Sequence, residues 1–230
     1  MRKLIYSVFK LGLYPRKRGT HKRKFKYFIA LFPWIYPFVS RWFWNQIGGE
    51  PYYKKVTVSS RHLAVCQYIL NGLDSLNFKN LLEVGCGTGN NLASLQSAYP
   101  DKIYRGCDFS LEQIRTARKH YEGIQFDIAD ARKLPYKDKT WDIVLVIGCL
   151  AHIPPKHISE CVQELKRVTS GYLLVFEEDL KFLPEIYAYP TGWHFYHNYN
   201  KLFHDFKTEW VGNNSPNVHF PLQTHVYRRG

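Results

Sequence analysis

The chain has 230 residues, of which 45% are hydrophobic and 17% aromatic, and its formal net charge is +13. This length and hydrophobic content suit one domain with a sizeable core and a short appendage. The chain has five cysteines and no CxxC pair, which argues against a disulfide framework and against a zinc site. We therefore expect no metal.

The positive charge is concentrated at the N-terminal end. Residues 1–49 hold 11 of the 32 Lys/Arg and no acid, whereas residues 50–230 hold the other 21 together with all 19 Asp/Glu. The segment is also rich in aromatic residues, and its uncharged stretch 27–40 contains Pro33 and Pro37. That stretch is shorter than the ~20 apolar residues of a membrane-spanning helix. We expect a basic aromatic extension over 1–49 and a separate domain over 50–230.

Lys10 interrupts the first apolar run, so a secretory signal is a poor fit. The expectation is a cytoplasmic protein, with peripheral attachment to a membrane through residues 1–45 as one option.

The rest of the chain alternates between helix-like and strand-like segments. A helix is expected from Ser60, because apolar residues at 63, 66, 69, 70 and 73 fall on one face. Strands are predicted at 81–86, 103–109, 123–129, 142–150 and 172–178. Helices are predicted between them at 90–99, 111–121 and 157–169. This alternation indicates an α/β fold with a parallel sheet and helices on both faces.

The tail breaks the alternation. A short helix is expected at 201–206. Two strands at 208–212 and 223–229 are expected to form a hairpin around the loop 213–217.

Three glycines follow the first predicted strand, in LLEVGCGTG (81–89). Ligands of doubly wound sheets bind at the carboxyl ends of strands, where glycines let the backbone approach them. The pattern GxGxG differs from the dinucleotide fingerprint GxGxxG and is weak by itself. Asp108 strengthens it, because a carboxylate at the end of the second strand can accept hydrogen bonds from both ribose hydroxyls. Asp130 follows the third strand, where an acid can meet an adenine amino group.

Together LLEVGCGTG, GCDFS and the stretch from Asp127 to Ile153 resemble the class I S-adenosylmethionine-dependent methyltransferases, over residues 78–180. The resemblance implies a doubly wound, Rossmann-like sheet of seven strands whose last strand is antiparallel. It also implies S-adenosylmethionine as cofactor and S-adenosylhomocysteine as product. The cofactor-binding residues that it implies are Glu83, Gly85, Cys86, Gly87, Thr88, Gly89, Asp108, Phe109, Asp130, Ala131, Ile147 and Gly148.

A narrower resemblance concerns the acceptor. Residues 146–178 and the ending 220–229 are similar to methylases of nonulosonic-acid and other surface-sugar pathways. That similarity implies a sugar or glycan acceptor.

Two residues are candidates for catalysis. His152 follows the fourth strand, where the family often places an acceptor-facing residue, and an imidazole can act as a base near neutral pH. Glu177, beside Glu178, ends the fifth strand at the same edge of the sheet and could contact a polar acceptor. The alternative for His152 is packing or hydrogen bonding within its loop, and the alternative for one of the two glutamates is simple solvation.

Two further groups of residues have more than one interpretation. The histidines and tyrosines of 194–206 form a weak metal pattern, an acceptor lid or ordinary packing. Residues 52–55 either cover the cofactor or form a linker.

The basic extension has three interpretations: it lies on an anionic membrane, it holds nucleic acid, or it is a structural lid on the core. The nearly neutral body and the lack of a familiar RNA-binding module favour a small or membrane-associated acceptor over RNA. We expect deletion of residues 1–45 to spare cofactor binding but to weaken engagement of the membrane or the acceptor.

The sequence thus predicts an S-adenosylmethionine-dependent methyltransferase that acts on oxygen or nitrogen of a small-molecule, sugar or glycan/lipid-linked acceptor. The alternatives are a methyltransferase of tRNA or rRNA, and a protein that binds the cofactor and serves only as a partner of another methyltransferase.

Overall fold

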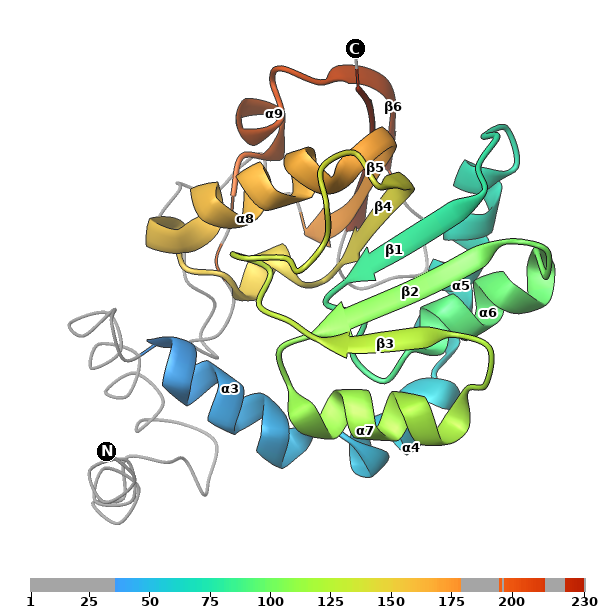
Figure 1. The fold of residues 1–230 in the computed structure, drawn as a ribbon, viewed down its shortest axis with the longest axis vertical. Coiled ribbons are helices and arrows are strands. Elements are labelled where there is room, and N and C mark those ends of the chain that lie inside the picture. The colour runs from blue at the N-terminus through green and yellow to red at the C-terminus, as the bar shows by residue number, and fades with distance from the viewer. Residues whose placement is uncertain (1–35, 179–194, 196, 214–221, 230) are drawn as a thin grey trace.

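The computed structural model describes residues 36–178, 195, 197–213 and 222–229 (Figure 1). Three helices precede the sheet: α3 (Tyr36–Ile47), α4 (Glu50–Thr57) and α5 (Ser60–Leu73). The strands are β1 (Asn80–Val84), β2 (Ile103–Asp108), β3 (Gln125–Ile128), β4 (Trp141–Ile147), β5 (Thr169–Glu178), β6 (Lys207–Asn213) and β7 (Leu222–Arg228). The remaining helices are α6 (Asn90–Ala98), α7 (Leu111–His120), the 3-10 turn η1 (Leu150–His152), α8 (Pro155–Val168) and α9 (Tyr199–Leu202).

The strands form one seven-stranded sheet in the order β3-β2-β1-β4-β5-β7-β6. Strands β1 to β5 pair in parallel, and β7 runs antiparallel between β5 and β6. The predicted fold class is therefore confirmed, including the antiparallel last strand and the pairing of the two tail strands. The predicted loop between those strands lies, apart from Asn213, outside the described residues. The chain reverses its direction of progress across the sheet between β1 and β4, which is where ligands of such sheets bind.

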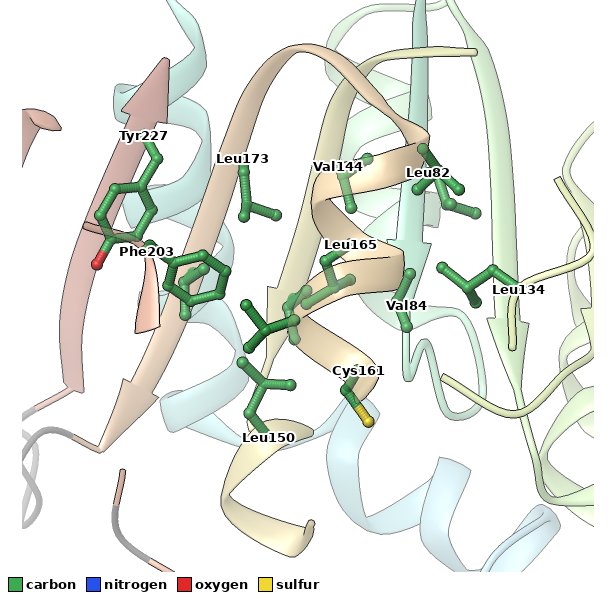
Figure 2. Close-up of a cluster of buried hydrophobic side chains, with 14 of the residues drawn as sticks. Leu82, Val84, Leu134, Val144, Leu150, Cys161, Leu165, Leu173, Phe203 and Tyr227 are labelled. Carbon is green, nitrogen blue, oxygen red and sulfur yellow. The ribbon is translucent and has the colours of Figure 1, made fainter. Parts of the chain in front are cut away.

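Helices cover both faces of the sheet (Figure 1). The side chains of β1 pack alternately on the two faces. Leu82 and Val84 belong to the core beneath α8, whereas Leu81 belongs to the core beneath α5, α6 and α7. Successive strand side chains point to opposite faces, so a strand covered on both sides is mostly hydrophobic, as β1 is apart from Asn80 and Glu83. Figure 2 shows the first of these cores, into which Leu150 of η1 projects beside Cys161 and Leu165 of α8.

The helix predicted at 201–206 is shorter and begins earlier. The side chain of Asn198 accepts a hydrogen bond from the Lys201 N–H and starts α9 at Tyr199. Phe203 and Phe206 lie beyond its end, buried in the core that Figure 2 shows. Burial of these two rings sets where the helix ends. The periodicity of the sequence does not report this tertiary contact.

Helix α3, from the predicted extension, lies against the N-terminal part of α7. The Asn45 side-chain oxygen accepts a hydrogen bond from the Ser110 hydroxyl over 2.8 Å, and the Gly49 N–H donates to the Gln113 side chain over 3.0 Å. No helix in the described ranges is long and apolar enough to cross a membrane. The division of the chain at residue 49 stays a prediction, and most of the basic segment lies outside the described residues.

Candidate functional site

A pocket opens at the carboxyl ends of β1, β2 and β4, where the strand order reverses. It is lined mainly by strand ends and the loops that follow them, together with side chains from α3, α4, α7, η1 and α8. The lining residues are Ser40, Trp44, Tyr52, Val84, Gly85, Gly87, Asp108, Phe109, Gln113, Ala129, Asp130, Ala131, Arg132, Ile147, Gly148, Cys149, His152, Ile153, Pro154 and His157.

The glycine loop after β1 is shaped by two positions that accept no other residue. Gly85 has φ +78°, and a Cβ there would lie 2.5 Å from the Cys149 sulfur. Gly89 has φ +81° and begins α6, and a Cβ there would lie 2.7 Å from the Phe126 ring. Only glycine adopts these conformations without strain and fits these spaces. The loop can therefore turn tightly under the pocket and expose its backbone.

Asp108 ends β2 at the pocket, and backbone groups hold its carboxylate. One oxygen accepts from the Ser110 N–H over 2.8 Å and the other from the Gly87 N–H over 3.1 Å. Burial raises the pKa of Asp108 to about 6, and the backbone N–H groups oppose that rise. An ionised carboxylate has about four acceptor positions, so both oxygens keep capacity toward the pocket.

Four of the predicted cofactor residues do not line the pocket. Glu83 is fully buried behind the glycine loop, where its carboxyl accepts from the Asn91 side chain over 2.7 Å, and burial raises its pKa to about 8. The Cys86 side chain is buried in the core below α5 and α6. The Thr88 hydroxyl donates to the Asn90 side chain. These side chains and Gly89 support the loop from behind, so the structure gives Glu83 a role in orienting the glycine loop and not a place in the pocket lining.

The adenine-side residues predicted from sequence do come together. Phe109, Asp130 and Ala131 all line the pocket. Burial disfavours the charge of Asp130, but Arg132 pairs with both of its oxygens, over 2.7 and 3.0 Å, and the net effect lowers the pKa of Asp130. The guanidinium of Arg41 on α3 lies 5.9 Å from the centre of the Phe109 ring, so α3 reaches this wall as well.

The position of Glu177 does not match its predicted role as a residue that contacts the acceptor. It is fully buried and does not line the pocket. Its carboxylate accepts the backbone N–H groups of Cys149 and Leu150, both over 2.7 Å, and of Ala151 over 3.3 Å. Glu177 thus holds the start of η1 in place, together with the buried side chain of Leu150 (Figure 2). The side chain of Glu178 lies outside the described residues.

We expect Glu177→Gln to lower the free energy of unfolding by about 1–3 kcal/mol, because an amide accepts these N–H groups less well than a buried carboxylate. Urea denaturation measures the loss. Asp142→Asn is the matched control, since Asp142 accepts the Lys79 N–H over 2.7 Å away from the pocket. A Glu177→Gln protein of wild-type stability that has lost methyl transfer would instead support the acceptor contact predicted from sequence.

His152 lies at the end of η1 and lines the pocket, as predicted. Its ring meets the indole of Trp44 edge to face, with centroids 5.0 Å apart, and Trp44 in turn meets Tyr52 at 6.2 Å. Tyr52 therefore lines the pocket, whereas Tyr53, Lys54 and Lys55 do not, and the covering of the cofactor by residues 52–55 stays a prediction. His157, in the first turn of α8, adds a second imidazole to the lining.

Sequence reasoning missed several lining residues: Ser40, Trp44, Gln113, Arg132, Cys149, Ile153, Pro154 and His157. His157 was detectable, since it follows His152 by five positions in the same motif. Trp44 carried no such signal, because it is one of many aromatic residues in its segment.

The histidines of the tail do not form a metal centre within the described residues. His197 contacts the Ile153 carbonyl over 2.9 Å, and His204 contacts the Lys201 carbonyl over 3.0 Å. His194 and Tyr196 of the same predicted group lie outside the described part of the chain. The described histidines therefore match the packing interpretation, and the lid interpretation stays a prediction.

Comparison with known proteins matches residues 81–171 to the family described as "Methyltransferase domain". Norajmaline N-methyltransferase of Rauvolfia serpentina is 34% identical over 40% of this chain and 32% of its own length. Fatty-acid O-methyltransferase of Mycolicibacterium smegmatis is 33% identical over 42% and 36%. The chain thus spans about a third of the length of these curated relatives. The PH0226 protein of Pyrococcus horikoshii shares the fold, with a TM-score of 0.58 and 20% identity over 80% of this chain and 93% of that one.

Residues 81–171 therefore match a methyltransferase domain, and this match supports the resemblance to the class I S-adenosylmethionine-dependent methyltransferases. The matched region carries the glycine loop, Asp108, Asp130 and His152, the residues that also surround the pocket. S-adenosylmethionine is the cofactor of this family, and the pocket fits it. Asp108 offers acceptor capacity to two ribose hydroxyls, Phe109 offers an apolar wall for a purine, and the loop at Gly85 and Gly87 exposes backbone.

Proposed function

We propose that this methyltransferase transfers a methyl group from S-adenosylmethionine to oxygen or nitrogen of a small-molecule or lipid acceptor. The observation that carries the proposal is the continuity of the pocket. It runs from the glycine loop and Asp108 to His152 and Trp44, so the cofactor residues and a candidate proton acceptor share one pocket.

The cofactor, when bound, supplies a methyl group already activated on a positively charged sulfur. The protein has to align a nucleophile with that methyl group and exclude water. Ile147 and Cys149 at the end of β4 and Trp44 on α3 provide apolar surface for this purpose. His152 is the side chain placed to take a proton from an acceptor hydroxyl or amine at its ring nitrogen. Glu177 acts through the backbone of η1 and does not touch the acceptor.

The named relatives support this class of acceptor. One is named for N-methylation of norajmaline and the other for O-methylation of a fatty acid. They support small-molecule or lipid chemistry over an RNA acceptor. A surface-sugar acceptor remains a narrower form of the proposal, and it rests only on the sequence similarity of 146–178 and 220–229.

The test is transfer of label from methyl-labelled S-adenosylmethionine to a host lysate that is then separated into nucleic acid, protein, lipid and small-molecule fractions. We expect label in the lipid or small-molecule fraction. His152→Ala should lower the transfer rate by about 100-fold, because a positioned base contributes at least that factor. S-adenosylhomocysteine affinity, measured by calorimetry, should stay within about twofold of wild type.

His204→Ala is the matched control, because His204 is exposed, lies outside the pocket lining and contacts the Lys201 carbonyl. It should leave the rate unchanged. Label in the nucleic-acid fraction would support the RNA alternative. Tight S-adenosylhomocysteine binding with no label in any fraction would support the non-catalytic partner. A His152→Ala enzyme as fast as wild type would remove the base role alone.

A further inference from the structure

We propose that Trp44 of α3, with His152, Ile153 and Pro154, forms an acceptor subsite selective for a neutral, apolar ring, and that Trp44 is its specificity-determining residue. The proposal rests on the methyltransferase function above and assigns the class of acceptor that this function leaves open. Trp44 lies outside residues 81–171, the region that matches the methyltransferase family.

The first support is the position of Trp44. Its indole lines the pocket and contacts the ring of His152 edge to face at an interplanar angle of 77°. It also contacts Tyr52 at 85°. An aromatic ring at such a place offers a large contact area and prefers other rings in edge-to-face or offset geometry. An acceptor ring that displays its nucleophile to His152 would lie against Trp44.

The second support is that α3 is held firmly in this place. Asn45, adjacent to Trp44, bonds to Ser110, and Ser110 in turn donates its N–H to Asp108. At Gly48 a Cβ would lie 2.3 Å from the Trp44 carbonyl oxygen and 2.9 Å from the Gln113 side chain. This close approach fixes the end of α3 on α7. The indole is therefore presented by an anchored helix, as a specificity residue must be.

The third support is the charge of the lining. Its carboxylates and guanidinium are those of Asp108, Asp130 and Arg132. Arg132 is paired with Asp130, and Asp108 is held by backbone N–H groups. Beside His152 the lining consists of Trp44, Cys149, Ile153 and Pro154, together with the imidazole of His157, which faces the carboxylate of Glu160 over 3.5 Å. A charged acceptor buried among these groups would lose its hydration without gaining a new ion pair, which is costly. A neutral apolar acceptor does not carry this desolvation cost.

The experiment uses two probes that share one ring system, 2-naphthol and the carboxylate 2-naphthoate, with the full-length protein loaded with S-adenosylhomocysteine. Binding is followed by indole nitrogen-15 NMR, in which Trp44→Phe identifies the Trp44 signal. We expect 2-naphthol to shift that signal saturably and to bind about tenfold more tightly than 2-naphthoate. Trp44→Ala should weaken 2-naphthol binding by about tenfold, and Trp44→Phe should restore most of it.

Ile47→Ala is the matched control, since Ile47 is on the same helix, partly exposed and outside the lining. It should leave 2-naphthol affinity within about twofold of wild type. The proposal is overturned if 2-naphthol does not bind, if 2-naphthoate binds as tightly, or if Trp44→Ala and wild type bind alike. Because Trp44→Phe keeps a ring in the same space, it tests the proposal even where Trp44→Ala fails to fold. If the wild-type protein does not bind S-adenosylhomocysteine at all, the proposed function itself is wrong.

Discussion

Replacing Asp108 with Asn is expected to weaken S-adenosylhomocysteine binding by about 100-fold, since hydrogen bonds to a charged acceptor are each worth about 1.5–3 kcal/mol. The carboxylate ends β2 inside the pocket and keeps acceptor capacity on both oxygens. An amide in its place can accept from only one ribose hydroxyl. Titration calorimetry at neutral pH measures the change, and circular dichroism confirms the fold.

The same residue gives cofactor binding a pH dependence. Because burial raises the pKa of Asp108 to about 6, the acceptor form is depleted as the pH falls below that value. Affinity should fall by about tenfold per pH unit below 6 in wild type and stay nearly flat in Asp108→Asn. Equal affinities of the two proteins at neutral pH would exclude Asp108 from ribose binding.

Stability should follow the opposite course. The folded pKa of Asp108 lies above the ordinary value of 3.8, so folding favours the protonated carboxyl. The contribution of Asp108 to stability is complete below pH 3.8 and is lost as the pH rises through 6. The stability of the cofactor-free wild type, relative to Asp108→Asn, should therefore fall by about 2–3 kcal/mol between acid and neutral pH. Urea denaturation at several pH values tests this.

Deletion of residues 1–49 is expected to weaken S-adenosylhomocysteine binding by at least about tenfold relative to deletion of 1–35. The longer deletion removes α3, with Ser40 and Trp44 of the lining and the Asn45 contact to Ser110. The sequence had indicated that loss of residues 1–45 would spare cofactor binding. The structure revises this expectation, because α3 is a wall of the site.

The two deletions are compared by calorimetry. The shorter one keeps every residue that the structure places at the pocket, so it controls for loss of the basic segment. Asn45→Ala provides a point variant that should weaken binding in the same direction if the longer deletion does not fold. Equal affinities of the two truncated proteins would show that α3 contributes nothing to the cofactor site.

Contiguous sequence determined much of this protein. Strand-like runs that alternate with amphipathic helices predict the doubly wound sheet, because the spacing of apolar residues indicates which face of each element is buried. The glycines after β1 and the acids after β2 and β3 could be placed at one edge, because parallel strands end on the same side of a sheet. Local order places Gly85, Asp108 and Asp130 at one edge of the sheet, the family resemblance adds His152, and the structure brings all four to one pocket.

Tertiary structure decided what each side chain touches. Glu177 could be placed at a strand end from sequence, but its three backbone partners come from η1, which packs there through Leu150. Trp44 reaches His152 only because α3 docks on α7 through Asn45 and Gly49. Periodicity and motif spacing describe neighbours along the chain. Contacts between distant segments depend on how whole elements pack, and that packing made Glu177 a support of the site and Trp44 a wall of it.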